Sequence, residues 1–229
     1  MFYIDPVYFW LVFIPTILIS IGVQLYLRST FSKWSKVKNS SGLVGPQVAN
    51  QLYDHTSLQP VRTERVKGTM TDHFDPGNNV VRLSDPVSTQ PSVASMAITA
   101  HELGHVQQYQ TGSALIKVRG FLLPALQFSP TVSYIAILLG LWFNMTGLLW
   151  LGIIFFALMV LFSLLTLPVE IDASRRGTRL LQEAGLMRSD ADAKGSKAVL
   201  TAAALTYLAA AITSILQLLY YISIAKRRS

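Results

Sequence analysis

The sequence contains no cysteine and only 4 histidines among its 229 residues. The lack of cysteine excludes disulfide bonds and thiolate metal ligands, so a strong metal site would have to use imidazole and carboxylate groups. Charge is also scarce, because Asp, Glu, Lys and Arg make up 14% of the chain whereas hydrophobic residues make up 51%. This balance is not that of an ordinary soluble domain and favours a protein that lies partly in lipid.

Four windows without any charged residue carry most of this hydrophobicity. They are residues 7–27, 121–143, 147–167 and 198–225, and each is near or above the roughly 20 residues with which a helix crosses a bilayer. The first window lacks a basic start and is longer than the apolar core of a secretory signal, which favours a retained anchor. Pro124 and Pro130 predict kinks in the second window, because neighbouring helices can satisfy the carbonyl groups that proline leaves unbonded. We therefore expect a mainly α integral membrane protein with about four transmembrane helices.

The placement of positive charge predicts an orientation. Residues 28–120 hold ten Lys and Arg residues and residues 168–197 hold six, whereas the N-terminus and the link 144–146 hold none. By the positive-inside rule both large segments are cytoplasmic and the N-terminus is outside. The tail Lys226–Arg228 would also lie outside if the fourth window crosses fully, and the sequence leaves that question open.

The net charge of +7 follows from the same asymmetry. Four basic residues surround Trp34 and suit an anionic lipid surface: Arg28, Lys33, Lys36 and Lys38. No run of interleaved basic and aromatic residues forms a nucleic-acid platform, so the expected partners are the lipid bilayer and a protein or peptide substrate, with no nucleic acid.

The run His101-Glu-Leu-Gly-His105 carries the chemistry. On an α-helix the two histidines are about 40° apart around the axis and can share one metal ion, whereas Glu102 lies about 100° further round and is free to reach a bound water. This pattern predicts two zinc ligands and a general base. The run 91–100 is small and apolar, with a helix start near Pro91 or Ser92, and a polar stretch ends at Gly112. The motif should therefore lie mid-helix.

A catalytic zinc site normally has three protein ligands. The candidates for the third are His55, His73, Glu170, Asp172, Glu183, Asp190 and Asp192. Glu170 fits best, because it follows the third apolar window and Pro168 can open or continue a helix there. Small residues on its helix, Ala173 and Gly177, would face the small residues around the histidines, Ala100 and Gly104, and let the two helices approach.

Asp172 points to another helix face than Glu170. It could hold the second nitrogen of a ligand histidine, as outer carboxylates do in metal sites. The alternative for both carboxylates is a charged boundary whose members form ion pairs with Arg175, Arg176 or Arg179.

Two short strands are expected at residues 61–66 and 79–84, together forming a hairpin. A free edge of the second strand, at Val81 and Arg82, could align a substrate peptide by main-chain hydrogen bonds. His73 lies in a turn-rich segment and is the first candidate for a donor to the developing oxyanion, with Arg175 and Arg176 as the next candidates. Its alternative is an exposed residue of a structural turn.

Elsewhere, Pro46 predicts the start of a helix whose Val48, Ala49 and Leu52 share one face. Gly185 predicts a helix end.

Four segments in this order carry a resemblance: 72–76, 80–84, 100–107 and 167–175. Over nearly the whole chain the sequence resembles the YugP-type family of bacterial membrane zinc metallopeptidases, and more distantly the HtpX-type gluzincin membrane proteases. The resemblance implies one Zn²⁺ per chain, held by His101, His105 and Glu170, with Glu102 as the base. Ala173 matches the HtpX-type pattern, but Ser174 stands where that pattern has Asp.

Together these features predict one membrane metallopeptidase domain over residues 1–229, in a bacterial inner membrane. Segments 28–120 and 168–197 would form a small cytoplasmic α+β zinc domain that contains the hairpin and the histidine helix. One alternative is an intramembrane-cleaving protease, although the apolar run before His101 is too short to span a bilayer. The other is a non-catalytic scaffold or adaptor that binds zinc for structure.

Overall fold

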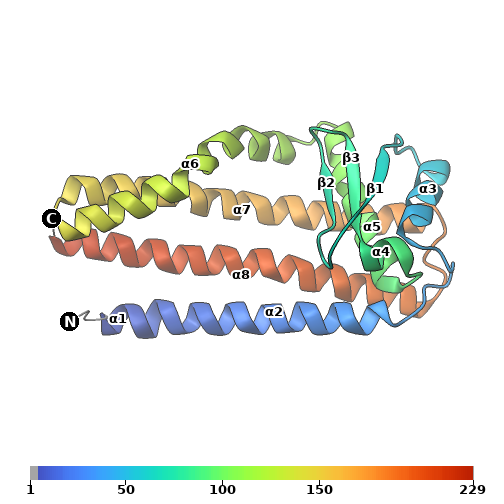
Figure 1. The fold of residues 1–229 in the computed structure, drawn as a ribbon, viewed down its shortest axis with the longest axis horizontal. Helices are drawn as coiled ribbons and strands as arrows, with labels where there is room; N and C mark the ends of the chain where they lie inside the picture. The colour runs from blue at the N-terminus through green and yellow to red at the C-terminus, as the bar shows by residue number, and fades with distance from the viewer. Residues whose placement is uncertain (1–4, 229) are drawn as a thin grey trace. The chain divides into compact units, whose positions relative to one another are not determined.

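The computed structural model describes residues 5–228 (Figure 1). The chain divides into two compact units. The helical unit comprises the chain up to Gln24, Lys117–Pro168 and the chain from Thr206, and the sheet unit comprises Leu25–Ile116 and Val169–Leu205. The elements are α1 (Pro6–Tyr8), a π-helix (Phe9–Phe13), α2 (Ile14–Ser35), α3 (Gly45–His55), β1 (Arg62–Val66), β2 (His73–Asp75), β3 (Val80–Ser84), α4 (Asp85–Thr89), α5 (Val93–Gln110), α6 (Ala114–Trp142), α7 (Thr146–Glu183) and α8 (Asp190–Arg228).

Within residues 5–228, four helical stretches are long and apolar enough to cross a membrane. They are Pro6–Ser35, Ala114–Trp142, Thr146–Glu183 and Asp190–Arg228. Three of them contain a whole predicted window and Ala114–Trp142 contains all of the second window except Phe143, which confirms the expected number of apolar helices. Proline does not interrupt them, because α6 continues through Pro124 and Pro130 and α7 continues through Pro168.

Within the helical unit, α6 and α7 pack closely through glycines. A Cβ added to Gly152 would lie 2.6 Å from Cγ1 of Ile137, and one added to Gly140 would lie 2.7 Å from the backbone nitrogen of Leu149. The hydroxyl of Ser133 donates to the carbonyl oxygen of Gly152 over 2.9 Å. Small residues and an interhelical hydrogen bond are the usual means of helix association in lipid, where hydrophobic burial offers little.

The last turn of α8 lies beside the α6–α7 link. Arg228 donates to the carbonyl oxygen of Leu141 at 3.1 Å and to the side-chain oxygen of Asn144 at 3.2 Å. At the other terminus, Asp5 accepts a hydrogen bond from the hydroxyl of Tyr220 at 3.2 Å and lies 3.9 Å from Arg227. The start of α1, the link and the end of α8 therefore meet at one end of the helical unit.

The sheet unit contains a three-stranded mixed sheet in the order β1-β3-β2. β1 and β3 lie side by side, but they run parallel, with Arg62 opposite Val80. The predicted hairpin between these two strands is therefore wrong, and the hairpin of the sheet is the antiparallel pair β2–β3. β3 is the central strand, so the free edge predicted at Val81 and Arg82 is also wrong.

The core of the sheet unit is formed by α3, β3, α5 and α7. Val48, Ala49 and Leu52 of α3 are fully buried in it, as predicted from the helix that Pro46 opens. Leu103 and Val106 of α5 join the same cluster. The helix that carries the two histidines is thus anchored by its apolar face.

Candidate metal centre

His101, Glu102 and His105 lie on α5, a largely buried helix with a capped N-terminus. The hydroxyl of Ser92 accepts from the backbone N–H of Ser95 at 3.0 Å and caps the N-terminus. The helix ends at Gln110, and Gly112 follows with a φ of +63°. The motif lies mid-helix as predicted, with both histidine side chains largely buried.

Two glycines bring α7 against this helix. A methyl group on Gly104 would collide with the carbonyl oxygen of Ala173, and one on Gly177 would collide with that of Ala100. Backbone therefore touches backbone at both positions. The close approach predicted from these four small residues is confirmed.

This approach brings Glu170 to the two histidines. Its Oε2 atom lies 3.3 Å from Nε2 of His101 and 3.4 Å from Nε2 of His105. One potential ligand atom from each of the three residues lies within 4.8 Å of the other two, so the group could hold a metal ion. His55 and Glu183 are exposed on α3 and α7 and do not belong to it.

Two of the three ligand separations fit zinc. Zinc bonds to imidazole nitrogen and carboxylate oxygen are about 2.0–2.1 Å long, which places the ligands of a tetrahedral site about 3.3–3.4 Å apart. The two separations between Glu170 and the histidines match that edge length. Two imidazoles and one carboxylate are also a donor set that catalytic zinc sites use, with a fourth position left for water or substrate.

The outer nitrogens of both histidines have partners. Nδ1 of His105 lies 3.0 Å from Oε1 of Gln108, and Nδ1 of His101 lies 3.1 Å from Oγ of Ser174. Asp172 contacts neither histidine in these bonds, because its Oδ2 accepts from the amide of Gln108 at 2.7 Å. Sequence reasoning expected Asp172 in this place and missed Gln108, whose signal was its position three residues after His105 on the same helix.

Glu102 is 7% exposed and lies between the two histidines in sequence. Burial raises the pKa of its carboxyl group above the usual value, and positive charge on His101 and His105 would act in the opposite direction. A raised pKa strengthens a carboxylate as a proton acceptor near neutral pH.

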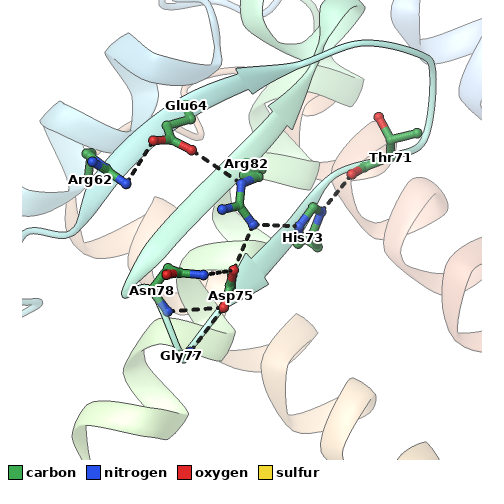
Figure 2. A network of polar contacts seen from close by, with 8 residues as sticks. All are labelled: Arg62, Glu64, Thr71, His73, Asp75, Gly77, Asn78 and Arg82. Atoms are coloured by element: carbon green, nitrogen blue, oxygen red, sulfur yellow. Dashed lines mark hydrogen bonds and ion pairs between the residues drawn. The ribbon is translucent and has the colours of Figure 1, made fainter.

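His73 belongs to a polar network on the sheet (Figure 2). Its Nδ1 lies 2.9 Å from the carbonyl oxygen of Thr71, and its Nε2 lies 3.3 Å from Nη1 of Arg82. Arginine can only donate, so Nε2 accepts and Nδ1–H donates to Thr71. Both ring nitrogens are thus engaged, and a role as oxyanion donor stays a prediction.

Arg82 is held by two carboxylates in the same network. It contacts Asp75 at 2.8 Å and Glu64 at 3.3 Å. The pKa of the Asp75 carboxyl lies well below its usual value, because the side chain of Asn78 and then Arg82 donate hydrogen bonds to it. The network fixes the turn between β2 and β3. Because β3 is the central strand, Val81 and Arg82 cannot align a substrate along a free edge, and any other contact of these two residues with substrate stays a prediction.

The two arginines that follow Asp172 differ in their surroundings. Arg175 is exposed. Arg176 donates from Nε to Oδ2 of Asp172 at 2.7 Å and lies 3.3 Å from the hydroxyl of Thr111. The expected ion pair with a carboxylate of this segment thus exists at Asp172, and contact of either arginine with substrate stays a prediction.

Comparison with known proteins agrees with this geometry. A family described as "Putative neutral zinc metallopeptidase" matches residues 9–226. The chain belongs to this family of zinc metallopeptidases. It is 39% identical over 206 residues to the "Putative membrane protease YugP" of Bacillus subtilis (strain 168), covering 90% of this chain and 91% of the relative. No solved structure matches the chain.

The family match covers every element that builds the metal centre. Both α5 and the part of α7 that carries Glu170 lie inside residues 9–226. The family is named for zinc, and the two imidazoles and one carboxylate of this centre are donors that suit zinc. The resemblance drawn from the four sequence segments is confirmed.

Proposed function

We propose that this metallopeptidase is a membrane-bound, zinc-dependent endopeptidase with one Zn²⁺ per chain. The observation that carries the proposal is the convergence of Glu170 on Nε2 of both histidines at 3.3 and 3.4 Å. His101, His105 and Glu170 would hold the ion, and Glu102 would serve as the general base.

The bound zinc supplies Lewis-acid chemistry, which polarises a peptide carbonyl and makes a water molecule more acidic. Glu102 would take a proton from the attacking water while the oxygen of that water bonds to the carbonyl carbon. The same carboxyl group then gives that proton to the amide nitrogen as the C–N bond breaks. One carboxylate thereby serves both steps, and the enzyme ends each cycle in its starting protonation state.

We further propose that the centre acts on the cytoplasmic face of a bacterial inner membrane. The ten and six basic residues of segments 28–120 and 168–197 support this orientation. The name of the Bacillus relative supports a membrane location and a protein substrate. The polar network of β1–β3 and the polar residues after His105 argue against a site within lipid.

The test is Glu102→Gln in the full-length protein, purified in detergent. General acid–base catalysis contributes roughly 10²- to 10⁴-fold, so casein cleavage should fall by at least about 100-fold. Zinc content, measured by mass spectrometry, should stay at one per chain. Glu183→Gln, which alters an exposed carboxylate at the end of α7, serves as the control and should keep both properties.

The alternatives give different results. Full activity in Glu102→Gln would remove the proposed base, and wild-type protein that binds no zinc would remove the centre itself. A protein that unfolds when zinc is chelated, yet cleaves no substrate under any condition, would be the zinc-binding scaffold or adaptor.

A further inference from the structure

Gln108 is fully buried and its amide has a fixed orientation. Its Nε2 atom lies 2.9 Å from the carbonyl oxygen of Val169 and 2.7 Å from Oδ2 of Asp172. A carbonyl oxygen can only accept, and so can an ionised carboxylate. The NH₂ group must therefore face these two atoms, and both of its hydrogens are used.

This orientation determines the tautomer of His105. With the NH₂ group committed to α7, the oxygen of Gln108 is the atom that faces Nδ1 of His105 at 3.0 Å. An amide oxygen accepts, so Nδ1 must carry the hydrogen. The lone pair of the neutral ring is then on Nε2, the nitrogen that faces Glu170.

We propose that Gln108 is a positioning residue for His105, and that Asp172 acts on this histidine only through Gln108. The proposal rests on the proposed function, in which His105 is a zinc ligand. It assigns to a buried amide the outer role that a carboxylate usually fills in zinc sites.

Asp172 stands one step further from the metal position. Its Oδ2 accepts from Gln108 and from Nε of Arg176, each at 2.7 Å. The negative charge of Asp172 is thus paired with Arg176, while a neutral amide contacts the ligand. His101 likewise has a neutral partner, the hydroxyl of Ser174. The Nδ1 atoms of both imidazoles thus contact neutral groups, whereas the carboxylate of Glu170 lies at their Nε2 atoms.

The first measurement is zinc affinity, by competition with a chelator, for wild type, Gln108→Met and Asp172→Ala in full-length detergent-solubilised protein. Methionine keeps the length of the side chain but forms neither the bond to His105 nor those to α7. Loss of an outer partner typically lowers metal affinity roughly 10- to 100-fold, which is the expectation for Gln108→Met. Gln107→Met, the same change one residue away on a partly exposed side chain, is the matched control and should stay near wild type.

The double variant Gln108→Met/Asp172→Ala tests whether Asp172 acts on His105 through Gln108 or independently of it. Asp172→Ala alone should lose less affinity than Gln108→Met, because the carbonyl of Val169 still holds the amide. When Gln108→Met is already present, Asp172→Ala should cause no further loss of zinc affinity. Additive losses would show that Asp172 contributes independently of Gln108 and would contradict the proposal.

A second readout is spectroscopic and does not depend on activity. The chain has only 4 histidines, so ¹⁵N-histidine labelling gives few ring signals, and His105 can be assigned by substitution. In metal-free protein, at a pH where the ring signals show His105 to be neutral, the bond from Nδ1–H to Gln108 favours one tautomer and the carboxylate of Glu170 at Nε2 favours the other. Wild type should therefore hold a larger share of the Nδ1–H tautomer than Gln108→Met, which keeps Glu170 but has lost the bond to Gln108.

The outcomes distinguish the two proposals. A wild type without zinc would end the proposed function. A wild type that binds zinc, together with a Gln108→Met protein of unchanged affinity and unchanged tautomer, would end only the inference. If Gln108→Met does not fold, the affinity and the tautomer of Asp172→Ala decide, because a variant with both unchanged would contradict the coupling.

Discussion

Glu170 supplies the only carboxylate in the proposed ligand group, and its removal is the most direct test of the centre. Glu170→Gln keeps the shape of the side chain but replaces a negatively charged donor by a neutral one. The expected loss of zinc affinity exceeds the roughly 100-fold upper range of an outer-partner change. Chelator competition on the purified protein measures it, beside Glu183→Gln on the same helix.

An unchanged zinc affinity in Glu170→Gln would mean that another residue is the third metal ligand. Asp172 is the nearest carboxylate in sequence, but its Oδ2 is bonded to Gln108 and Arg176. The control also guards against a general effect of charge removal, since both variants lose one negative charge from α7.

The residues of the centre differ in how far the sequence could predict them. His101, Glu102 and His105 follow from helix periodicity, because their relation depends on one local element. Glu170 required the flanking small residues as well. The role of Gln108 could not be predicted, because its orientation depends on Val169 and Asp172 of another helix.

Among the elements, α5 and α7 determine whether the three groups can meet. Gly104→Ala places a methyl group against the carbonyl oxygen of Ala173, so the helices must separate. Overpacking of this kind costs roughly 1–3 kcal/mol, and the displacement also moves Glu170 away from the histidines. We expect a lower thermal unfolding midpoint together with weaker zinc binding.

A glycine in open space provides the control for this change. Gly120 of α6 has no neighbour within 4 Å of an added Cβ, and alanine is the better helix former by roughly 0.5–1 kcal/mol. Gly120→Ala should therefore keep zinc binding and should not lower the unfolding midpoint. Normal zinc affinity in Gly104→Ala would contradict this prediction. It would mean that zinc binding does not depend on the close approach of α5 and α7.

The strands show where prediction from local pattern fails. β2 has only three residues, which is too short for an alternating signal, so the sequence suggested that β1 and β3 pair directly as a hairpin. In the structure β2 supplies the antiparallel partner, and β3 becomes central, with Val80, Val81 and Leu83 fully buried. Strand existence follows from local residues, whereas pairing depends on the rest of the fold.

At the scale of the whole molecule, the basic tail at Lys226–Arg228 seemed to conflict with the charge rule. The helical unit offers a physical explanation, because two of these three residues have polar partners at one end of it. Arg228 donates to Leu141 and Asn144, and Arg227 lies near Asp5. We therefore predict that the fourth helix crosses fully and ends on the same side as the α6–α7 link.

The absence of cysteine allows a direct test of this topology. Met145→Cys places a single thiol on an exposed residue at the α6–α7 link, and Thr69→Cys places one on an exposed residue between β1 and β2. A membrane-impermeant maleimide applied to right-side-out vesicles should label Met145→Cys. It should label Thr69→Cys only after the membrane is permeabilised.

A third variant addresses the end of α8. Lys226→Cys should be labelled like Met145→Cys, because Arg228 lies against the link. The wild-type chain provides the blank, since it has no thiol to react. Labelling of Thr69→Cys in sealed vesicles, with Met145→Cys protected, would invert the proposed orientation and place the metal centre outside the cell. Protection of Lys226→Cys beside a labelled Met145→Cys would mean that the fourth helix does not reach the outer side.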